Sequence, residues 1–374
     1  MKVLLIATGV FLKGGIERYT RYQYKALQES YGNENVILAS LLGGELDNSF
    51  EEEIEVEYVQ GGIGLVDKVR FVFKCLQLIR KKKIELVICN HRQLSIIGYL
   101  GQVLFKVAYI TNVYGLEIWS GMNKVEKNAL LSSSSLIGDC NFILKYINEN
   151  YNYRYSQMDL LYDAVDIDKF RPESKNIALL KKYGIPEGRF IIATIGRLER
   201  NKGHQLIIKT LKELPESIVY LIVGGGSTMN SLETLVKELE LDDRVIFTDR
   251  VPENELVSLY NISDIVILLS VFGKNEGEGL PLGLIEASAC GKPIICGNED
   301  GSQDAISEDL PNGRLINPRS QQELKDAINS YLENSEELQS HGANGRRFVT
   351  ENFDYEIFRK RQEEIIKSLD IGIG

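Results

Sequence analysis

One pattern occurs twice in this chain and constrains its fold more than any other feature. The apolar run at residues 3–7 leads through a loop ending in Gly14-Gly15 into an amphipathic stretch. The apolar run at residues 190–195 leads through a loop ending in Lys202-Gly203 into another. A short apolar run, a glycine-containing loop and an amphipathic helix are typical of the first unit of a doubly wound parallel sheet. The repetition predicts two such sheets, one in each half.

The rest of the chain continues the alternation of short apolar runs with longer amphipathic ones. We expect strands at residues 3–7, 36–39, 54–59, 86–89, 107–111, 136–138, 159–161, 190–195, 219–223, 245–247, 265–269 and 293–296. Expected helices include residues 17–29, 67–82, 95–105, 232–240, 253–260 and 355–369. Strands that alternate with helices predict an α/β fold with parallel sheets. We expect two Rossmann-like, doubly wound domains facing a cleft at the carboxyl ends of both sheets.

The alternation lapses at residues 163–176, a polar segment containing a proline. We therefore expect an N-terminal domain (residues 1–168), a C-terminal domain (169–352) and a helical segment (353–374) that packs back on the N-terminal domain. A chain of 374 residues is long enough to bury two cores. Asp166 and Asp168 spell the Asp-x-Asp pattern of metal-dependent sugar transfer. They lie in a connector and not after a strand, so we interpret them as turn and capping residues.

Composition narrows the classes of partner. A formal net charge of −10 argues against nucleic acid as a principal partner. The five cysteines form no Cys-x-x-Cys pair and are interpreted as reduced core thiols of a cytoplasmic protein. The first residues are typical of a strand rather than a signal peptide, and the apolar stretch 94–110 is interrupted too often to span a membrane. His, Cys and carboxylate residues form no cluster that suggests a metal, and we expect none.

Residues 276–295 place two carboxylates beside a predicted helix start. An apolar strand ends at Leu269, Pro281 suits the first turn of a helix, and Gly291 can end it. Glu278 and Glu286 therefore flank a helix N-terminus. Free backbone N–H groups there hold phosphate, while flanking carboxylates accept hydrogen bonds from sugar hydroxyls. The segment predicts a site for a sugar attached to a phosphate.

Two cations follow a strand in the same half of the chain. Arg197 and Lys202 lie just past the apolar run at residues 190–195, where a helix begins. They would neutralise a departing diphosphate, with Arg197 holding two oxygens and Lys202 acting as a point charge. A solvated turn is the alternative. The two carboxylates in the same domain favour a functional role.

Other candidates lie in the first half. The loop at residues 9–15 lets backbone approach a ligand, but it is not Gly-x-Gly-x-x-Gly and no acidic residue ends the second strand, so a nicotinamide dinucleotide site is poorly supported. His91 follows the strand at residues 86–89 and is a candidate site residue, although imidazoles at strand ends are often structural. We expect His204 in a first helical turn and His341 in an exposed helix.

Residues 67–83 are predicted to form a basic amphipathic helix. The apolar residues Val69, Val72, Phe73, Leu76 and Ile79 are assigned to one side. We favour a helix that packs on the sheet with a solvated charged face. Contact with an anionic membrane surface is the alternative.

With these residues assembled, the chain resembles the retaining glycosyltransferases of family 4, which have the two-domain GT-B fold. The segment from Glu278 to Glu286 is similar to that family's Glu-x7-Glu signature. Arg197 and Lys202 match its Gly-Arg-Leu…Lys-Gly motif. Weaker similarities are Gly14-Gly15-Ile-Glu17 to its first glycine-rich loop, residues 165–170 to its interdomain connector and Asn312-Gly313 to its late turn. The likeness extends from Met1 to beyond Phe353.

The resemblance implies roles for these residues. Arg197 and Lys202 would hold the donor diphosphate, Glu286 would bond the ribose, and Glu278 would contact the donor sugar. The implied donor-binding set also contains Gly14, Gly15, Gly279, Leu280, Pro281 and Leu282, of which residues 279–282 supply backbone amides. The resemblance further implies retention of anomeric configuration by front-face attack, in which the leaving phosphate accepts the acceptor's proton.

One position departs from the family pattern. After the strand at residues 107–111 the family commonly has His-Gly-x-(Asp/Glu), whereas this chain has Tyr114-Gly115-Leu116-Glu117. Either Tyr114 substitutes for the imidazole as a hydroxyl donor or another group does. Tyr114 and His91 are therefore candidate sugar or acceptor contacts.

The expected function is retaining, metal-independent transfer of a hexose from a UDP- or GDP-sugar to a glycan or lipid-linked acceptor. Arg197, Lys202 and Glu278 are the expected catalytic residues, and no cofactor is expected beyond the nucleotide-sugar co-substrate. By resemblance, the setting is surface polysaccharide (capsule, lipopolysaccharide or exopolysaccharide) assembly in the cytoplasm, with peripheral contact at the inner membrane face as an option. The alternatives are a GT-B sugar-nucleotide epimerase, whose catalytic groups we cannot place, and a catalytically silent nucleotide-sugar-binding protein, supported by Tyr114 alone.

Overall fold

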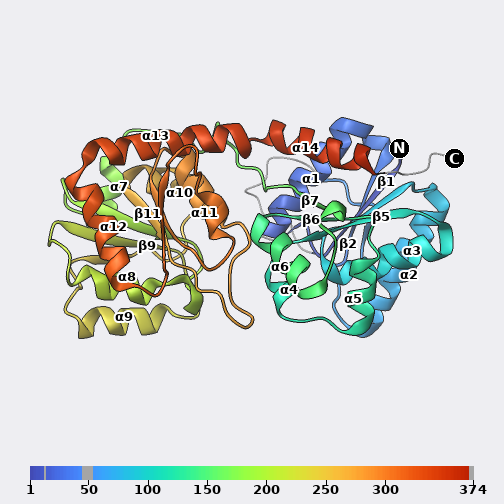
Figure 1. Cartoon of the computed structure of the whole chain (residues 1–374), viewed down its shortest axis with the longest axis horizontal. Coiled ribbons are helices and arrows are strands. Elements are labelled where there is room, and N and C mark those ends of the chain that lie inside the picture. Colours follow the sequence, from blue (N-terminus) through green and yellow to red (C-terminus); the bar gives the residue numbers. More distant parts are fainter. Residues whose placement is uncertain (12–13, 44–53, 370–374) are drawn as a thin grey trace. The chain divides into compact units, whose positions relative to one another are not determined.

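The computed structural model describes residues 1–11, 14–43 and 54–369. It divides into two units, each a sheet with helices on both faces (Figure 1). The N-terminal unit consists of Met1–Ala164 and the segment that begins at Tyr355, and the C-terminal unit consists of Val165–Asp354. Residues 12–13 of the first glycine-containing loop and residues 370–374 of the predicted final segment lie outside the described residues.

The N-terminal unit contains a seven-stranded sheet in the order β3-β2-β1-β4-β5-β6-β7. All of its strand pairs are parallel. The strands are β1 (Val3–Ala7), β2 (Val36–Ser40), β3 (Tyr58–Val59), β4 (Leu86–Cys89), β5 (Ala108–Val113), β6 (Ser135–Gly138) and β7 (Met158–Leu160). The strand order reverses between β1 and β4, which is where doubly wound sheets bind ligands.

Helices cover both faces of this sheet. They are α1 (Gly15–Tyr31), α2 (Leu65–Lys82), α3 (Ser95–Phe105), α4 (Leu116–Trp119), α5 (Lys124–Leu131), α6 (Asn141–Tyr151) and α14 (Tyr355–Ser368). The final helix, α14, packs against α1, where the Phe358 and Tyr19 rings meet edge to face at 5.3 Å. The Tyr355 hydroxyl donates to Glu29 at 2.9 Å.

The C-terminal unit contains a six-stranded parallel sheet in the order β10-β9-β8-β11-β12-β13. Its strands are β8 (Phe190–Ile195), β9 (Ile218–Val223), β10 (Val245–Phe247), β11 (Ile265–Leu268), β12 (Ile294–Gly297) and β13 (Gly313–Ile316). Its helices are α7 (Ile177–Lys182), α8 (His204–Leu211), α9 (Met229–Glu238), α10 (Glu253–Ile262), α11 (Leu282–Ala289), α12 (Gln321–Glu333) and α13 (Ser335–Asn352). Here the order reverses between β8 and β11.

Near-continuous apolar runs form the central strands because both faces of a parallel sheet are buried. Every residue of β1 has an exposed fraction of 0%. Each sheet accordingly has one apolar cluster on either face, built from alternate residues of the same strands. The expected α/β class and the strand–helix alternation are confirmed.

Several details differ from the sequence predictions. Gly313, expected in a late turn, begins the edge strand β13, in which Gly313 and Arg314 stand in place of an apolar run and Leu315 is exposed. The strand expected at residues 54–59 is shortened to β3, and β5 runs to Val113. His341 is buried, not exposed as expected. Its Nδ1 lies 2.7 Å from the Tyr331 hydroxyl on helix α12.

The connector and the cysteines behave as expected. One carboxylate oxygen of Asp166 accepts hydrogen bonds from the backbone N–H groups of Asp168 (3.1 Å) and Lys169 (2.9 Å), so this pattern is a turn, as predicted. All five cysteine side chains belong to the described residues, and they are buried without a disulfide among them. Within the described ranges, no helix is long and apolar enough to cross a membrane.

Candidate functional site

The loops that follow β8 and β11 meet at the switch point of the C-terminal sheet. β8 and β11 are neighbours in the sheet, and β8 is followed by residues 196–203 and β11 by residues 269–281. The Val271 N–H donates to the Asn201 carbonyl at 2.8 Å, which joins the two loops directly. Arg197 and Lys202 on one loop and Glu278 on the other, all predicted from the sequence, therefore lie at the edge of the sheet where such folds bind ligands.

Lys202 and Glu278 form an ion pair across these loops. The Lys202 Nζ lies 2.6 Å from Glu278 Oε1, and the two side chains are 12% and 21% exposed. A partly buried pair of this kind keeps a cation at the switch point while no anion is bound. A ligand phosphate would compete with Glu278 for Lys202.

Glycines shape the loop that carries the cations. Gly203 has a φ of +78°, and a Cβ there would lie 2.5 Å from the Leu269 carbonyl oxygen, so only glycine fits. Gly224, after β9, has a φ of +128°, and a Cβ there would collide with the Gly196 carbonyl. These close approaches fix the path of residues 196–203 against both neighbouring strands.

Arg197 has a different environment from Lys202. Its side chain is exposed, and its guanidinium has no hydrogen-bond or ion-pair partner among the described residues. The backbone beside it is held firmly, since the Leu198 N–H donates to the Gly225 carbonyl at 3.1 Å. Arg197 is thus a guanidinium on an anchored loop whose donors face solvent.

Helix α11 begins at the same edge of the sheet. Pro281 is its N-cap and no side chain caps its first turn, which leaves backbone N–H groups for a ligand. Gly279, Leu280 and Leu282 stand around this start. Glu286, in the second turn, is 6% exposed, and its Oε2 accepts a hydrogen bond from the Tyr260 hydroxyl at 2.7 Å. Tyr260 therefore orients the carboxylate of Glu286, a residue that the sequence predicts as part of the site.

Asp300 is a site residue that sequence reasoning missed. It is completely buried after β12, and its Oδ2 accepts the Glu278 N–H at 2.9 Å while its Oδ1 accepts the Ser302 N–H at 3.0 Å. Burial raises the pKa of the Asp300 carboxyl to about 6, and the Glu278 charge acts in the same direction. Asp300 positions the backbone of Glu278. Its place just beyond a strand at the carboxyl edge is the signal that could have identified it.

His204 lies behind the cationic loop as the first residue of α8. Its Nδ1 is 2.9 Å from the Tyr220 hydroxyl, which donates to Thr194 Oγ1 at 2.8 Å, and Thr194 in turn donates to the Ile267 carbonyl. This chain of donors makes Nδ1 the protonated ring nitrogen. Burial lowers the pKa of His204 to about 4, assisted by Lys202. His204 is a neutral structural residue under the loop.

The corresponding loop of the N-terminal unit is built differently. Gly14 is the N-cap of α1 and Gly15 its first residue, with no side-chain cap. A Cβ on Gly14 would meet only the carboxylate of Glu17, which is the end of a flexible side chain. Gly14 and Gly15 thus stand at a helix start near the reversal of the first sheet.

Tyr114 follows β5 and is buried in the core of the N-terminal unit. Its ring packs edge to face on Tyr19 at 5.2 Å, and its hydroxyl lies 3.4 Å from Asn112 Nδ2. The Tyr114 N–H donates to Glu117 Oε1 at 2.6 Å. Burial raises the pKa of the Tyr114 hydroxyl well above its ordinary value. With 8% of its surface exposed, Tyr114 is mainly a packing residue.

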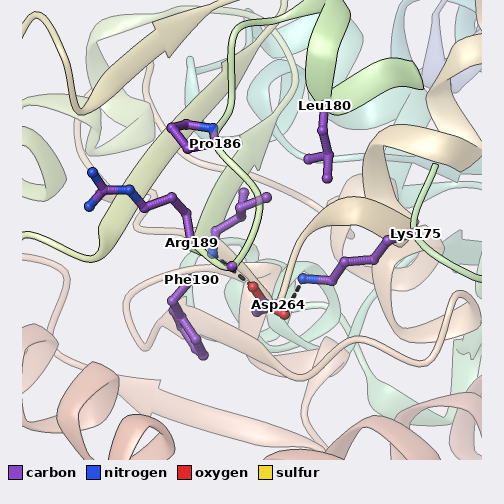
Figure 2. Close-up of a pocket in the computed structure, with 8 residues that line it drawn as sticks. Lys175, Leu180, Pro186, Arg189, Phe190 and Asp264 are labelled. Atoms are coloured by element: carbon purple, nitrogen blue, oxygen red, sulfur yellow. Dashed lines mark hydrogen bonds and ion pairs between the residues drawn. The ribbon is translucent and has the colours of Figure 1, made fainter. Parts of the chain in front are cut away.

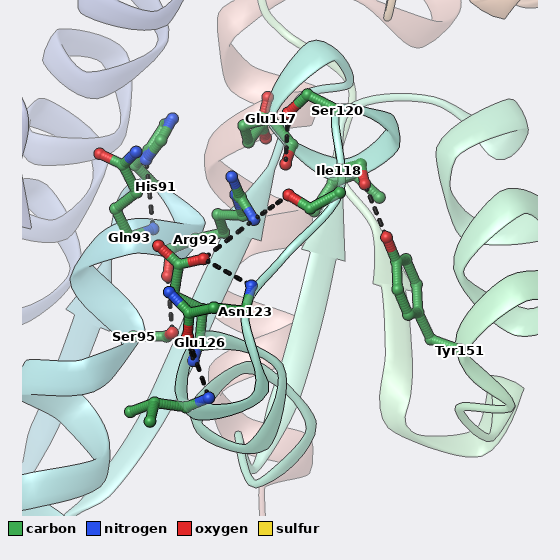
Figure 3. Close-up of polar contacts among 12 residues, drawn as sticks. His91, Arg92, Gln93, Ser95, Glu117, Ile118, Ser120, Asn123, Glu126 and Tyr151 are labelled. Carbon is green, nitrogen blue, oxygen red and sulfur yellow. Dashed lines mark hydrogen bonds and ion pairs between the residues drawn. The ribbon is translucent and has the colours of Figure 1, made fainter. Parts of the chain in front are cut away.

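His91 lies two residues past β4, in a cluster of charged side chains (Figure 3). Its Nδ1 accepts the Gln93 N–H at 3.2 Å, so His91 caps the short helix that follows. Burial lowers the His91 pKa, and Glu117 opposes this shift. The neighbouring Arg92 donates to the Gly121 carbonyl at 2.8 Å and lies 3.5 Å from Glu126.

A pocket of about 340 Å³ lies elsewhere in the C-terminal unit (Figure 2). Lys175 and Asp264 line it and form a 2.6 Å ion pair. Asp264 directly precedes β11, so the pocket lies at the amino ends of the strands, opposite the edge where doubly wound folds bind ligands. We therefore place the candidate site at Arg197, Lys202, Glu278 and Glu286. In the part of the chain that the structure describes, no His, Cys, Asp and Glu side chains gather into a metal-binding group.

Part of the chain matches a known protein family. Residues 176–348 match the family model "Glycosyl transferases group 1". The matched residues all lie within the C-terminal unit. The match includes Arg197, Lys202, Glu278, Glu286 and Asp300, whereas the whole N-terminal unit lies outside it.

Similar whole proteins point the same way. A GDP-mannose-dependent alpha-(1-6)-phosphatidylinositol monomannoside mannosyltransferase of Mycolicibacterium smegmatis is 24% identical over 283 residues, covering 73% of each chain. The Anabaena HepE structure in complex with UDP has a TM-score of 0.82 at 18% identity and covers 99% of this chain and 100% of its own. Sucrose-phosphate synthase from Thermosynechococcus elongatus has a TM-score of 0.80 at 20% identity, with 99% of both chains covered. The fold is that of GT-B glycosyltransferases.

Proposed function

We propose that this chain is a retaining glycosyltransferase that moves a hexose from a UDP- or GDP-sugar to a glycan or lipid-linked acceptor. The observation that carries the proposal is the pairing of Lys202 with Glu278 beside the uncapped start of α11, inside the region that matches the glycosyltransferase domain model. Nucleotide-sugar relatives support it, since one is GDP-mannose-dependent and one neighbour was solved with UDP.

In this proposal the C-terminal unit holds the donor. Arg197 and Lys202 bind the diphosphate oxygens, with the first-turn N–H groups of α11 beside them. Glu286, oriented by Tyr260, accepts the ribose hydroxyls. Glu278 contacts the sugar once phosphate has taken its place on Lys202.

We propose the following chemical step. The acceptor oxygen forms a bond to the anomeric carbon on the face from which the diphosphate leaves, and the bond between that carbon and the phosphate oxygen breaks. The acceptor's proton passes to the leaving phosphate, so the configuration is retained. Arg197 and Lys202 stabilise the charge that builds up on the diphosphate, and the mechanism needs no metal ion.

The N-terminal unit supplies the acceptor contacts in this proposal, with His91 as a candidate. The setting that we propose is cytoplasmic assembly of a surface polysaccharide, with peripheral contact with an anionic membrane through the helix at residues 67–83. A mannosyltransferase that acts on a phosphatidylinositol mannoside is a relative that supports a lipid-linked acceptor.

A transfer assay tests the proposal. Radiolabelled UDP- and GDP-hexoses are incubated with the chain and membrane extract, and the labelled product is analysed by NMR for its anomeric configuration. We expect one donor to label an extractable glycan or lipid with the configuration of the donor. An inverted product would overturn the retaining step. Labelled free donor with an altered hexose would indicate the epimerase alternative, and nucleotide binding without any product would indicate the catalytically silent alternative.

A further inference from the structure

Helix α2 carries apolar residues beyond its packing side, and two of the five residues assigned to that side, Val69 and Phe73, are exposed, whereas Val72, Leu76 and Ile79 do pack on the core. The buried residues are Phe71, Cys75, Leu78 and Ile79. Val69 and Phe73, assigned to the packing side, are 51% and 73% exposed. Because residues four apart share one side of a helix, Leu65, Val69 and Phe73 form an exposed stripe along α2. Leu65 is 79% exposed, and Val66 beside it is 62% exposed.

Exposed apolar residues also lie just before α2 and on the neighbouring helix α3. Ile63, just before α2, is 68% exposed. Helix α3 lies beside α2 in the same unit (Figure 1) and packs on it closely enough that a Cβ on Gly101 would lie 3.1 Å from Ile79. Helix α3 exposes Val103 (50%) and Leu104 (58%). We call Ile63, Leu65, Val66, Val69, Phe73, Val103 and Leu104 the α2–α3 surface. Singly exposed apolar residues are ordinary, but a run of this kind marks an interaction surface.

Basic residues accompany this surface. From Leu65 to Lys83 the chain has seven Lys or Arg and one Asp. Asp67 caps the start of α2, where its Oδ2 accepts a hydrogen bond from the Gly64 N–H at 3.2 Å. Lys82 pairs with Glu57 at 3.1 Å, and Lys74 lies over the Tyr58 ring. The other five, Lys68, Arg70, Arg80, Lys81 and Lys83, are exposed and form no ion pair with a described residue.

The combination of apolar and basic side chains indicates which class of partner the α2–α3 surface binds. In a symmetric dimer the same surface would face itself, so the basic residues of two copies would repel one another. The whole chain has a net charge of −10, so this helix concentrates positive charge on an otherwise acidic molecule. Leu, Val and Phe side chains suit the boundary between lipid headgroups and acyl chains, and Lys and Arg suit anionic headgroups.

We propose that the α2–α3 surface docks on the surface of an anionic lipid bilayer, with Leu65, Val69 and Phe73 inserted between the headgroups and Arg80 and Lys81 against their phosphates. This inference builds on the proposed function, because a lipid-linked acceptor is presented at such a surface. The docking replaces the solvated charged face that the sequence analysis favoured for this helix.

Vesicle sedimentation tests the docking with the full chain. Vesicles of phosphatidylcholine alone are compared with vesicles that also contain phosphatidylglycerol as the anionic lipid. We expect binding to the anionic vesicles and little to the neutral ones. The variant Arg80→Gln/Lys81→Gln should lower the partition coefficient about 25-fold, or about fivefold for each basic residue. The variant Leu65→Ser/Phe73→Ser should lose binding by at least about tenfold, since two apolar side chains no longer insert.

Matched controls come from the same chain. Val125 is 65% exposed on α5 of the same unit, and Lys212 and Lys237 are exposed on the C-terminal unit. Val125→Ser and Lys212→Gln/Lys237→Gln should bind anionic vesicles as the wild type does. Equal losses in these controls, or no binding of the wild type to anionic vesicles, would overturn the docking. So would a reversible wild-type dimer that Leu65→Ser/Phe73→Ser dissociates, since that assigns the surface to a second copy.

Calorimetry with UDP and GDP separates this inference from the proposed function. The two surface variants should bind nucleotide like the wild type, because α2 belongs to the N-terminal unit and the donor residues to the C-terminal unit. A wild type that binds anionic vesicles but neither nucleotide would contradict the proposed function and leave the docking intact. A wild type that binds nucleotide but no vesicles would contradict the docking alone.

Discussion

The switch points of the two sheets use the same local structure for different purposes. In the C-terminal unit, Lys202 and Glu278 are paired but remain partly exposed, and Arg197 is exposed. In the N-terminal unit, Asn90 and Asn112 follow or end the central strands and are completely buried, with Asn112 Nδ2 donating to Gln23 at 2.7 Å and Asn90 Oδ1 at 2.8 Å. The C-terminal switch point exposes its charged groups to solvent, whereas the N-terminal one buries its amides, which join helix α1 to the sheet.

The repeated strand–loop–helix pattern therefore sets the backbone geometry at each switch point, while the residues in the loop decide whether its polar groups are exposed or buried. A cation at the end of a short loop remains accessible to an anion because burying it unpaired is costly. Amides satisfy one another and can be buried as a network. Four substitutions test this difference, in order of decreasing expected effect.

Arg197→Ala should produce the largest loss. If its guanidinium stabilises the departing diphosphate, turnover should fall by about 10²- to 10³-fold, as for the removal of one such donor in other enzymes. Initial rates with the preferred donor measure the change. Lys175→Ala is the matched control, because Lys175 also belongs to a 2.6 Å ion pair of the same unit, at the amino ends of the strands. Equal losses in the two variants would refute the placement of the site.

Gly203→Ala should have the next largest effect, which is a loss of stability. Alanine at a φ of +78° with a Cβ 2.5 Å from the Leu269 carbonyl should cost about 3 kcal/mol, which lowers the Tm by about 10 °C. Gly14→Ala in the N-terminal loop should cost less than about 1 kcal/mol, since Glu17 can move aside. Differential scanning fluorimetry compares the two. Similar Tm values would show that the two loops are not built differently.

His204 should make stability depend on pH. Its folded pKa of about 4 lies below the ordinary value, so its contribution is present above pH 6.5 and is lost as the pH falls from there toward 4, where the unfolded chain takes up a proton first. Between pH 7 and pH 5 the wild type should lose about 2 kcal/mol relative to His204→Gln. The Tm difference between the two proteins across this range measures it. A difference that stays constant with pH would contradict a neutral buried His204.

Tyr114→Phe should have the smallest effect. The hydroxyl makes one long contact with Asn112, at 3.4 Å, and the ring packs in the core. Turnover should change by less than about threefold and stability by less than about 1 kcal/mol. A loss of turnover comparable with that of Arg197→Ala would show that Tyr114 takes over the role of the family's histidine.

The elements were more predictable from the sequence than their exposure. Strand β1 consists of apolar residues alone and β8 contains one polar residue, Thr194, so their bounds could be predicted residue by residue. The bounds of β13 could not be predicted, because its first two residues, Gly313 and Arg314, interrupt the apolar pattern and hide its pairing with β12. For α2 the sequence offers apolar residues beyond one side, and only packing against the sheet selects Phe71 and Cys75 over Val69 and Phe73.

The candidate site was predictable where it is local and not where it is assembled over distance. Glu278 and Glu286 are eight residues apart, and Arg197 and Lys202 share one loop, so spacing suffices to find them. The Lys202–Glu278 pair and the contact of Tyr260 with Glu286 join segments far apart in sequence. The contact of Asp300 with the Glu278 backbone is also of this kind.

The central claim is that the C-terminal switch point holds the donor diphosphate, and calorimetric titration with UDP, GDP and ADP tests it most directly. We expect one nucleotide to bind the wild type. The affinity should fall by at least about 100-fold in Lys202→Ala/Glu286→Ala, which removes a charge-assisted contact to phosphate and one to ribose, each worth about 1.5–3 kcal/mol. Lys175→Ala should bind like the wild type. Binding of equal strength in Lys202→Ala/Glu286→Ala, or binding of no nucleotide by the wild type, would contradict the account.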